Sequence, residues 1–314
     1  MSGIEWTTET WNPVTGCQRV SEGCQNCYAE QMAGRLKQMG VDQYEDVVDK
    51  PDGVDEWRWT GEITLVEHRL DKPLKWTHDN LRIFVDSMSD LFHEDVPFKY
   101  IAACFGVMAA CPEHTFQILT KRPERMRQFF EWLSSETREV YGGDRGEFRG
   151  KFCELEAEKR LDGELRASSI GWPLPNVWLG VSAEHQKAAD ERIPPLLECP
   201  AAVHFVSAEP LLGSIDFSRI RNEEWGRYNP MRSPDLDWVI VGGESGKGAR
   251  ECSVDAIRSI AKQCLTNGVP VFVKQLGAVP VGDNVNEIDD PKGGDPDEWP
   301  DELWVREFPE GVSP

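Results

Sequence analysis

The sequence lacks the long apolar run that a transmembrane helix requires. Its first residues, MSGIEWTTET, also lack the basic and apolar stretches of a signal peptide, so we expect the protein in the cytoplasm. Basic residues are scarce, because 34 Lys and Arg face 55 Asp and Glu, for a net charge of −21. This charge repels a phosphate backbone at long range and argues against a general nucleic-acid-binding protein.

Several catalytic and nucleotide-binding motifs are missing as well. No G-x-G-x-x-G follows the first expected strand, and no G-x-x-x-x-G-K-[ST] occurs, so nucleotide binding by these two routes is not supported. An α/β-hydrolase is not supported either, because the chain has no nucleophile elbow. His114 precedes an expected strand and is interpreted as structural, whereas His93 follows a polar strand end and is a candidate acid–base group.

The sequence does contain a regular series of short apolar runs, rich in Val, Ile and Phe, that do not alternate with polar residues. This pattern is typical of parallel strands covered on both faces. The runs lie at 4–11 and begin again at Arg82, Thr115, Asn176, Val203, Asp237 and Pro270. Helical patterns at 28–39, 99–110, 124–134, 185–197 and 253–267 separate them. The alternation predicts a parallel α/β fold, either an open doubly wound sheet or a full or partial (β/α) barrel.

Two segments interrupt this series. Residues 40–80 are rich in Trp and Asp and are expected to form a loop over the barrel mouth or a small hairpin. Residues 135–175 are highly charged and are expected to form an inserted helix with irregular flanks. We therefore predict a barrel domain over 1–277 with these two insertions, and an acidic extension over 278–314 that packs on or beside it. The extension holds 11 acidic and 2 basic residues, and its LWVREFP segment is a candidate edge strand.

Polar or charged residues follow six of the expected strands. In parallel α/β folds ligands bind beyond the carboxyl ends of the strands. Single Ser or Asp residues there often cap the following helix, but charged groups near a barrel mouth are costly unless they are paired or used. Such a ring of acids and bases would suit a zwitterionic, ribose-bearing ligand. These residues are Asp86, Ser87, Ser89 and Asp90; Thr120, Lys121 and Arg122; Ser182 and Glu184; Ser207 and Glu209; Gly242, Gly243, Glu244 and Ser245; and Lys274 and Gln275.

Three of the nine cysteines lie close together after the first strand, with the spacing Cys17-x6-Cys24-x2-Cys27 and an aromatic Tyr28 directly after them. The other cysteines are scattered, and five of them lie in apolar or helical surroundings typical of small buried residues. Three thiolates can bind zinc or an iron–sulfur cluster. Zinc needs a fourth ligand, and the nearest downstream histidine is His68. A cluster held by three cysteines instead leaves one iron open to a substrate or cofactor.

The cysteine loop resembles that of radical S-adenosylmethionine (SAM) enzymes, although their usual spacing is C-x3-C-x2-C. More closely, the chain resembles a phage-associated, largely uncharacterised radical-SAM-like family. The similarity rests on WNPVTGC…GCQNCYA, FVDSMSDLFH, FQILTKRPER, NVWLGVSAE, FVSAEPLLG, WVIVGGESG and VFVKQLG, which together span 11–277. The resemblance implies a partial or full (β/α) barrel of about six to eight strands. It also implies that the protein acts in the cytoplasm of a phage host.

The resemblance also implies a [4Fe–4S] cluster on Cys17, Cys24 and Cys27, with SAM bound at the open iron. Reductive cleavage of SAM, with an electron from an external donor, would give a 5′-deoxyadenosyl radical that abstracts hydrogen from the substrate. A nucleotide or a hypermodified thymine in phage DNA is the expected substrate, and a rearrangement such as isomerisation the expected reaction. The implied SAM contacts are Tyr28, Asp86, Ser87, Ser89, Ser182, Glu184 and Glu209. The implied substrate contacts are Lys121, Arg122, Gly242 and Gly243, and the implied catalytic residues are Glu244 and Lys274.

The alternative hypothesis is a binding protein without catalysis. In it, zinc or a cluster on the cysteines stabilises the first loop, and the strand-end charges pair among themselves. Replacing the cysteines would then impair folding, whereas in a radical enzyme it would remove SAM cleavage and leave the fold intact.

Overall fold

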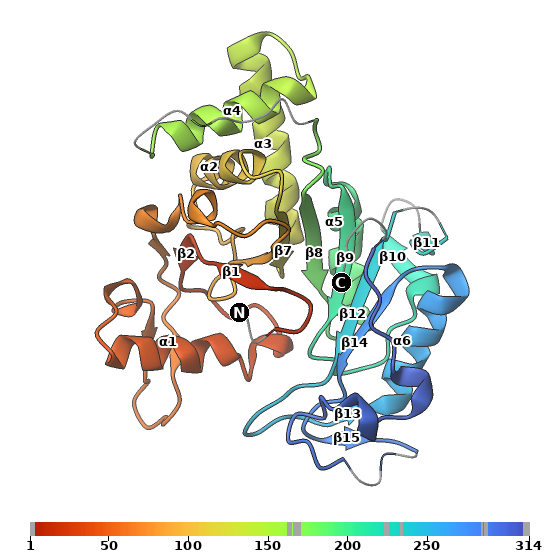
Figure 1. Cartoon of the computed structure of the whole chain (residues 1–314). Coiled ribbons are helices and arrows are strands. Elements are labelled where there is room, and N and C mark those ends of the chain that lie inside the picture. Colours follow the sequence, from red (N-terminus) through yellow and green to blue (C-terminus); the bar gives the residue numbers. More distant parts are fainter. Residues whose placement is uncertain are drawn as a thin grey trace. The chain divides into compact units, whose positions relative to one another are not determined.

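The computed structural model of the protein describes residues 4–161, 165, 171–222, 226–232, 235–283, 285 and 288–309. Seven of its strands form one sheet in the order β1-β6-β7-β8-β9-β12-β14 (Figure 1). These strands are β1 (Glu9–Trp11), β6 (Arg82–Val85), β7 (Thr115–Thr120), β8 (Val177–Ser182), β9 (Val203–Ala208), β12 (Trp238–Gly242) and β14 (Val271–Gln275). Every strand neighbours the sheet strand that precedes it in the chain, and the pairing is parallel.

This order decides between the two expected topologies. A doubly wound sheet reverses its strand order at a switch point, whereas successive parallel strands of a (β/α) barrel are added in one direction. The predicted parallel α/β fold of the partial-barrel type is confirmed. The described residues of β8 and β12 are all buried, as expected for strands covered on both faces.

The helices fall close to their predicted positions. They are α1 (Tyr28–Gln38), α2 (Phe98–Ala109), α3 (Pro123–Tyr141), α4 (Gly146–Glu158), α5 (Gln186–Leu197) and α6 (Val254–Asn267). The inserted helix expected within 135–175 is α4. However, α3 continues beyond the predicted end at 134 to Tyr141, where Gly142 with a φ of 69° ends it. No helix in the described part of the chain combines the length and the apolar character needed to cross a bilayer.

Short strands complete the structure. Within the Trp- and Asp-rich segment, β3 (Val48–Asp49) pairs with β4 (Arg58–Trp59), which forms the expected small hairpin. The antiparallel pair β2 (Val14–Thr15) and β5 (Thr64–Leu65) ties this segment to the loop after β1. The remaining pairs are β10 (Ile220–Asn222) with β11 (Gly226–Tyr228), and β13 (Cys252–Ser253) with β15 (Pro280–Val281). Near the end of the described chain, Arg306 bridges Phe272 of β14 in antiparallel fashion, as expected for LWVREFP.

The chain divides into two compact units, one comprising 1–179 and 199–202 and the other 180–198 and 203–314. The boundary between these units along the chain falls within β8, and the residues from 278 onward belong to the second unit. Each unit is described separately below.

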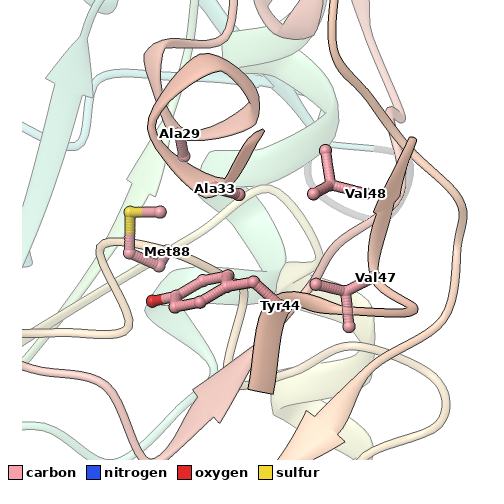
Figure 2. Packing of buried hydrophobic residues seen from close by; sticks show 6 residues of the cluster. All are labelled: Ala29, Ala33, Tyr44, Val47, Val48 and Met88. Carbon is pink, nitrogen blue, oxygen red and sulfur yellow. The ribbon is translucent and has the colours of Figure 1, made fainter. Parts of the chain in front are cut away.

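In the first unit, which contains β1, β6 and β7, helix α2 contacts both α3 and α4 (Figure 1). Helix α1 packs on its own apolar cluster, formed by Ala29, Ala33, Tyr44, Val47, Val48 and Met88 (Figure 2). Cys27 packs against this cluster from its edge. The start of α1, and with it the last of the three clustered cysteines, is therefore fixed by a small core of its own.

In the second unit, α6 packs on β12 and β14, and α5 packs on β9 (Figure 1). Gly180 of β8 is required by close packing, because a Cβ there would lie 2.4 Å from the ring of Phe205. Phe205 in turn packs against Trp238 of β12, with ring centroids 5.7 Å apart. The strands of this unit therefore share a dense aromatic core.

Candidate functional site

The three clustered cysteines lie in the loop between β1 and α1, beyond the carboxyl end of β1. Gly16 begins the turn toward them with a φ of 92°, and a Cβ at this position would lie 2.3 Å from the carbonyl oxygen of Glu62. Only glycine fits such a site. Gly16 also donates its N–H to the carbonyl of Met88, at 3.3 Å. This contact places Cys17 beside the loop that follows β6.

The exposure of the cysteines separates these three from the rest. Cys17, Cys24 and Cys27 are partly exposed, whereas Cys104, Cys111, Cys153, Cys199, Cys252 and Cys264 are buried, and all nine are free thiols. Cys24 ends a short 3-10 turn, and Cys27 occupies the N-cap position of α1. Thiols that are both clustered and accessible are the ones available to a metal. Cys153, which lies within the charged segment and belongs to α4, is fully buried.

The protonation of these thiols depends on their surroundings. Burial raises the pKa of Cys27, while the backbone N–H groups of Glu30 and Ala29 at the helix N-terminus oppose this rise. Burial also raises the pKa of Cys17 to about 12, with a further contribution from Asp90 and an opposing one from Arg122. A metal would therefore have to displace a proton from Cys17 when it binds.

The described residues form no ready-made site for a single metal ion. No three Cys, His, Asp or Glu side chains of the described residues converge as the ligands of one metal ion do. In a cuboidal cluster each thiolate binds a different iron, so the three sulfurs stand further apart than ligands of one ion. Cys17 and Cys27 nevertheless act on each other electrostatically, because the charge of Cys27 makes a small contribution to the raised pKa of Cys17. Three soft donors on one fixed loop thus fit a three-cysteine iron–sulfur group.

An ion pair that the sequence analysis missed braces the cysteine loop. Arg19 Nε donates to Glu30 Oε1 at 2.8 Å, and its Nη2 donates to the carbonyl of Gln25 at 2.8 Å. Glu30 lies in the first turn of α1, is only 1% exposed, and accepts a further bond from the N–H of Trp59. The pair therefore joins the middle of the loop to the helix that follows it. Nothing in the local sequence pattern distinguishes this Arg and Glu from surface residues.

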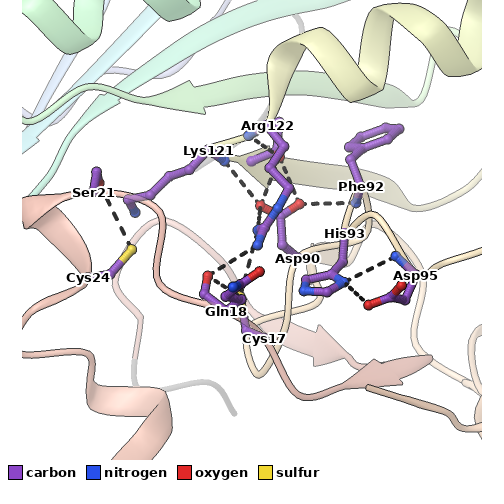
Figure 3. A network of polar contacts seen from close by, with 11 residues as sticks. Cys17, Gln18, Ser21, Cys24, Asp90, Phe92, His93, Asp95, Lys121 and Arg122 are labelled. Atoms are coloured by element: carbon purple, nitrogen blue, oxygen red, sulfur yellow. Dashed lines mark hydrogen bonds and ion pairs between the residues drawn. The ribbon is translucent and has the colours of Figure 1, made fainter. Parts of the chain in front are cut away.

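A second buried network connects the ends of β6 and β7 (Figure 3). Asp90 is 6% exposed, and its carboxylate accepts bonds from the N–H of Phe92 at 3.0 Å and from Thr120 Oγ1 at 2.7 Å. It also accepts from the N–H of Lys121 at 3.2 Å and from Arg122 Nη1 at 3.1 Å. Asp90 thus fixes the segment that carries both predicted substrate-binding residues of this strand.

Arg122 extends this network to the cysteines (Figure 3). Its Nη1 lies 3.8 Å from Cys17 Sγ, and its Nη2 donates to the carbonyl of Gln18 at 3.1 Å. The guanidinium is therefore engaged with Asp90 and with the cysteine loop. Lys121, by contrast, is half-buried, and its positive charge acts to lower the pKa of Cys27.

His93 lies at the edge of the same network (Figure 3). It is 2% exposed, and its Nδ1 accepts from the N–H of Asp95 at 3.3 Å. Its Nε2 has no hydrogen-bond partner within the described residues. Burial and, secondly, the charge of Arg122 lower the pKa of His93, so the ring is held neutral.

The predicted SAM-binding residues after β6 join this loop to the loop after β1. Asp86, with a φ of 59°, accepts from the N–H of Val14 at 3.1 Å through Oδ1, while its buried Oδ2 has no partner among the residues described. Burial raises the pKa of Asp86 to about 8. Ser89 Oγ donates to the carbonyl of Val14 at 3.0 Å. These two side chains therefore hold the start of the cysteine loop.

Tyr28 and Ser87 make a further link of the same kind. Tyr28 is 57% exposed, but its hydroxyl donates to the carbonyl of Ser87 at 2.7 Å. Ser87 Oγ donates to Asn12 Oδ1 at 3.1 Å. The structure thus brings Tyr28, Ser87 and the cysteine loop together within the first unit.

In the second unit, one predicted residue is buried in an ion pair. Glu184 is 0% exposed, and Arg192 Nη1 of α5 donates to its carboxylate at 2.7 Å. The same nitrogen donates to the carbonyl of Ser182, also at 2.7 Å. Glu184 and Ser182 therefore anchor α5 to the end of β8.

Glu209 and Lys274 form a more accessible pair at the ends of β9 and β14. Lys274 Nζ lies 3.1 Å from Glu209 Oε1, and their side chains remain 21% and 14% exposed, respectively. Ser207 Oγ donates to Glu209 Oε2 at 3.2 Å. Gly242 leaves space for the carboxylate, because a Cβ there would lie 2.9 Å from Glu209 Oε1. The structure thus brings together four of the predicted strand-end residues of this unit, three of them polar.

The two remaining predicted positions have structural contacts. Arg250 Nη2 donates to Glu244 Oε1 at 2.8 Å, and the N–H of Arg250 donates to Oε2 at 3.0 Å. A Cβ on Gly243 would lie 2.4 Å from the carbonyl oxygen of Leu276, so close backbone packing accounts for this glycine. The two predicted catalytic residues therefore have different partners: Glu244 pairs with Arg250, and Lys274 pairs with Glu209.

Comparison with known proteins gives one match. The model of a family described as "Protein of unknown function (DUF5131)" matches residues 1–299. The chain belongs to the DUF5131 family. No curated protein and no solved structure matches it. The family match covers the cysteine loop and every strand-end residue discussed above, whereas the phage association and the radical chemistry stay predictions.

For this DUF5131 protein, the sequence identified the positions of the polar residues but not their partners. The strand ends and the cysteine loop could be recognised from local patterns. The partners Arg19, Glu30, Arg192 and Arg250 could not, because each pairing depends on how the loops and helices fold back. The contribution of Asp90 as the centre of a buried network was likewise absent from the predicted site.

Proposed function

We propose that this DUF5131 protein is a radical SAM enzyme in which Cys17, Cys24 and Cys27 hold a [4Fe–4S] cluster. The observation that carries this proposal is the contrast among the cysteines: the three in the loop after β1 are partly exposed, and the other six are buried. When bound, such a cluster supplies the electron for the reductive cleavage of SAM. The substrate stays a prediction from the resemblance, namely a nucleotide or a modified thymine base.

The residues around the loop hold it in place for this role. Gly16 sets the turn, the Arg19–Glu30 pair joins the loop to α1, and Arg122 contacts Cys17. The ligands of a functional site keep their geometry only when packed, hydrogen-bonded groups hold them in place. The cysteine loop has such support, although its only regular secondary structure among the described residues is one 3-10 turn.

In the second unit, we assign substrate or SAM binding to Glu209 and Lys274 rather than to Glu184. All three are charged strand-end residues, but Glu184 is 0% exposed, whereas Glu209 and Lys274 are partly accessible. A buried, fully paired carboxylate stabilises structure, and breaking its pair is costly. An accessible pair can exchange its partner for the polar groups of a ligand.

The test is anaerobic reconstitution with iron and sulfide. The wild-type protein is expected to bind about four irons per chain, to turn brown and to form 5′-deoxyadenosine from SAM when reduced. Single Cys17→Ala, Cys24→Ala and Cys27→Ala variants are expected to remain folded by circular dichroism and to lose 5′-deoxyadenosine formation. Cys264→Ala, in α6, is the matched control and should retain both the iron and the activity. A wild-type protein that reconstitutes fully but never cleaves SAM would contradict the proposal.

One observation favours the second candidate, a cysteine-stabilised binding protein. Strand-end charges are paired within the protein, as Glu184 with Arg192 and Glu244 with Arg250 illustrate. In that case the protein as purified would be colourless and would hold one zinc, and a chelator would unfold it. The same cysteine variants would then lose their secondary structure rather than only their activity.

A further inference from the structure

Arg122 occupies an unusual place for a residue predicted to bind substrate. It lies directly after β7, at the N-cap position of α3, and its backbone N–H donates to Thr120 Oγ1 at 2.9 Å. Pro123 follows and fixes the start of the helix. The side chain is 9% exposed, so its guanidinium is held in one position with little access to solvent.

The guanidinium lies between a carboxylate and a thiol. Nη1 lies 3.1 Å from Asp90 Oδ2 and 3.8 Å from Cys17 Sγ, while Nη2 donates to the carbonyl of Gln18 (Figure 3). Because five N–H donors in a rigid fork can serve several acceptors, Arg can contact all three at once. Asp90 is equally fixed, since it accepts from two backbone N–H groups and from Thr120.

These two charges act on Cys17 in opposite directions. A positive group that donates to a metal-bound sulfur stabilises the additional negative charge of the reduced state, and this raises the reduction potential. A nearby carboxylate disfavours that charge and lowers the potential. Both effects are strengthened where the groups are shielded from water, as Arg122 and Asp90 are.

We infer that the Arg122–Asp90 pair sets the reduction potential of the metal group held by Cys17, and that Arg122 is a positioning residue rather than a substrate ligand. This inference rests on the proposed function, because it requires a redox-active group on the cysteines. It assigns opposite effects to the two members of one ion pair. If the pair only held the loop in place, losing either member would loosen the same loop, and the two losses would not shift the reduction potential in opposite directions.

The experiment is a redox titration of the reconstituted protein, followed by electron paramagnetic resonance of the reduced cluster. Arg122→Gln is expected to shift the potential to a more negative value, and Asp90→Asn to a more positive one. The double variant should lie between them, because the two opposite shifts offset each other. Arg122→Lys, which keeps the charge without the fork, should lie closer to the wild type than Arg122→Gln does.

Arg125→Gln is the matched control. Arg125 lies one turn further along α3, where it bonds the carbonyls of Glu94 and Val96 and stacks over Phe98. The Arg125→Gln variant loses the same charge as Arg122→Gln and should leave the reduction potential unchanged. Iron content and thermal unfolding are measured for every variant.

Three results would overturn the inference. The first is a shift of the same sign in Arg122→Gln and Asp90→Asn, or no shift in either, at full iron content. The second is an equal loss of iron from Arg122→Gln and Arg122→Lys, which would make Arg122 a brace for the loop only. The third is a wild-type protein that takes up no cluster, and this alone would also remove the proposed function.

Discussion

Asp86 holds the cysteine loop by a hydrogen bond, but its burial also lowers the stability of the folded protein. Its Oδ1 accepts the N–H of Val14 and so holds the start of the cysteine loop, but its Oδ2 is buried without a partner among the described residues. Burial raises its pKa to about 8. The folded protein therefore keeps a proton on Asp86 in a pH range where the unfolded chain, with a pKa of about 3.9, has released it.

The sign of the resulting pH dependence follows from this difference. Between about pH 4 and pH 8 the folded state binds more protons at Asp86 than the unfolded state, so its contribution to the free energy of unfolding falls as pH rises. Asp86→Asn should remove this contribution, on the order of a few kcal/mol at pH 8. The substitution keeps an acceptor for Val14, and Asn tolerates the positive φ of 59°.

The measurement is urea unfolding of wild type and variant at pH 5 and pH 8. The variant should gain stability relative to wild type at pH 8 and gain little at pH 5. Asp52→Asn, in the exposed turn before β4, serves as the control and should leave the difference between the two pH values as in wild type. A variant with the same pH dependence as wild type would show that the Asp86 carboxyl is ionised in the folded protein.

At the scale of the elements, local sequence patterns predicted most of the structure because each strand and helix is determined largely by its own residues. Unalternating runs such as VWLGVS mark strands that are buried on both faces, and the structure buries all six residues of β8. The end of α3 was predicted too early, at 134. The buried face of the helix extends beyond 134 to Thr137, one turn after Leu133, and Gly142 ends the helix.

The contacts between elements were harder to predict, because nothing in a local pattern indicates which residues of two helices meet. Gly106 in α2 shows this. A Cβ there would lie 2.3 Å from the carbonyl oxygen of Cys153 in α4, so the two helices pack through the glycine. The same reasoning applies to the site: the charges of Glu184 and Arg122 could be located from the sequence, whereas their partners could not.

Gly106→Ala should therefore destabilise the first unit by about 1–3 kcal/mol, because the added methyl meets backbone that cannot rotate away. Gly150 in α4 offers a matched control, since a Cβ there would have no atom within 4 Å. Gly150→Ala should be neutral or stabilising by about 0.5–1 kcal/mol, as expected for replacing glycine inside a helix. Thermal unfolding of both variants tests the pair, and equal midpoints would contradict close α2–α4 packing at Gly106.

At the scale of the whole molecule, the chain folds as two compact units, and the candidate cysteine site belongs to the first one. The loop is linked within this unit to the end of β6 through the Gly16–Met88 bond and to the end of β7 through Arg122. It is linked to α1 through Arg19 and Glu30. A group bound by the cysteines should therefore stabilise a defined set of segments rather than the chain as a whole.

Hydrogen exchange measured before and after anaerobic reconstitution, without SAM, tests this expectation. Protection should increase in 16–38, in 86–93 and at 120–122, because opening any of these segments would break contacts that the bound group now reinforces. Helices α5 and α6 belong to the second unit, and the loop contacts described above do not involve them, so their exchange should be unchanged. The Cys24→Ala variant, treated identically, controls for iron and sulfide that bind elsewhere. Protection that rises equally in α6 would mean that the two units unfold together, and the bound group would then stabilise the protein through global folding rather than through the network around Arg122.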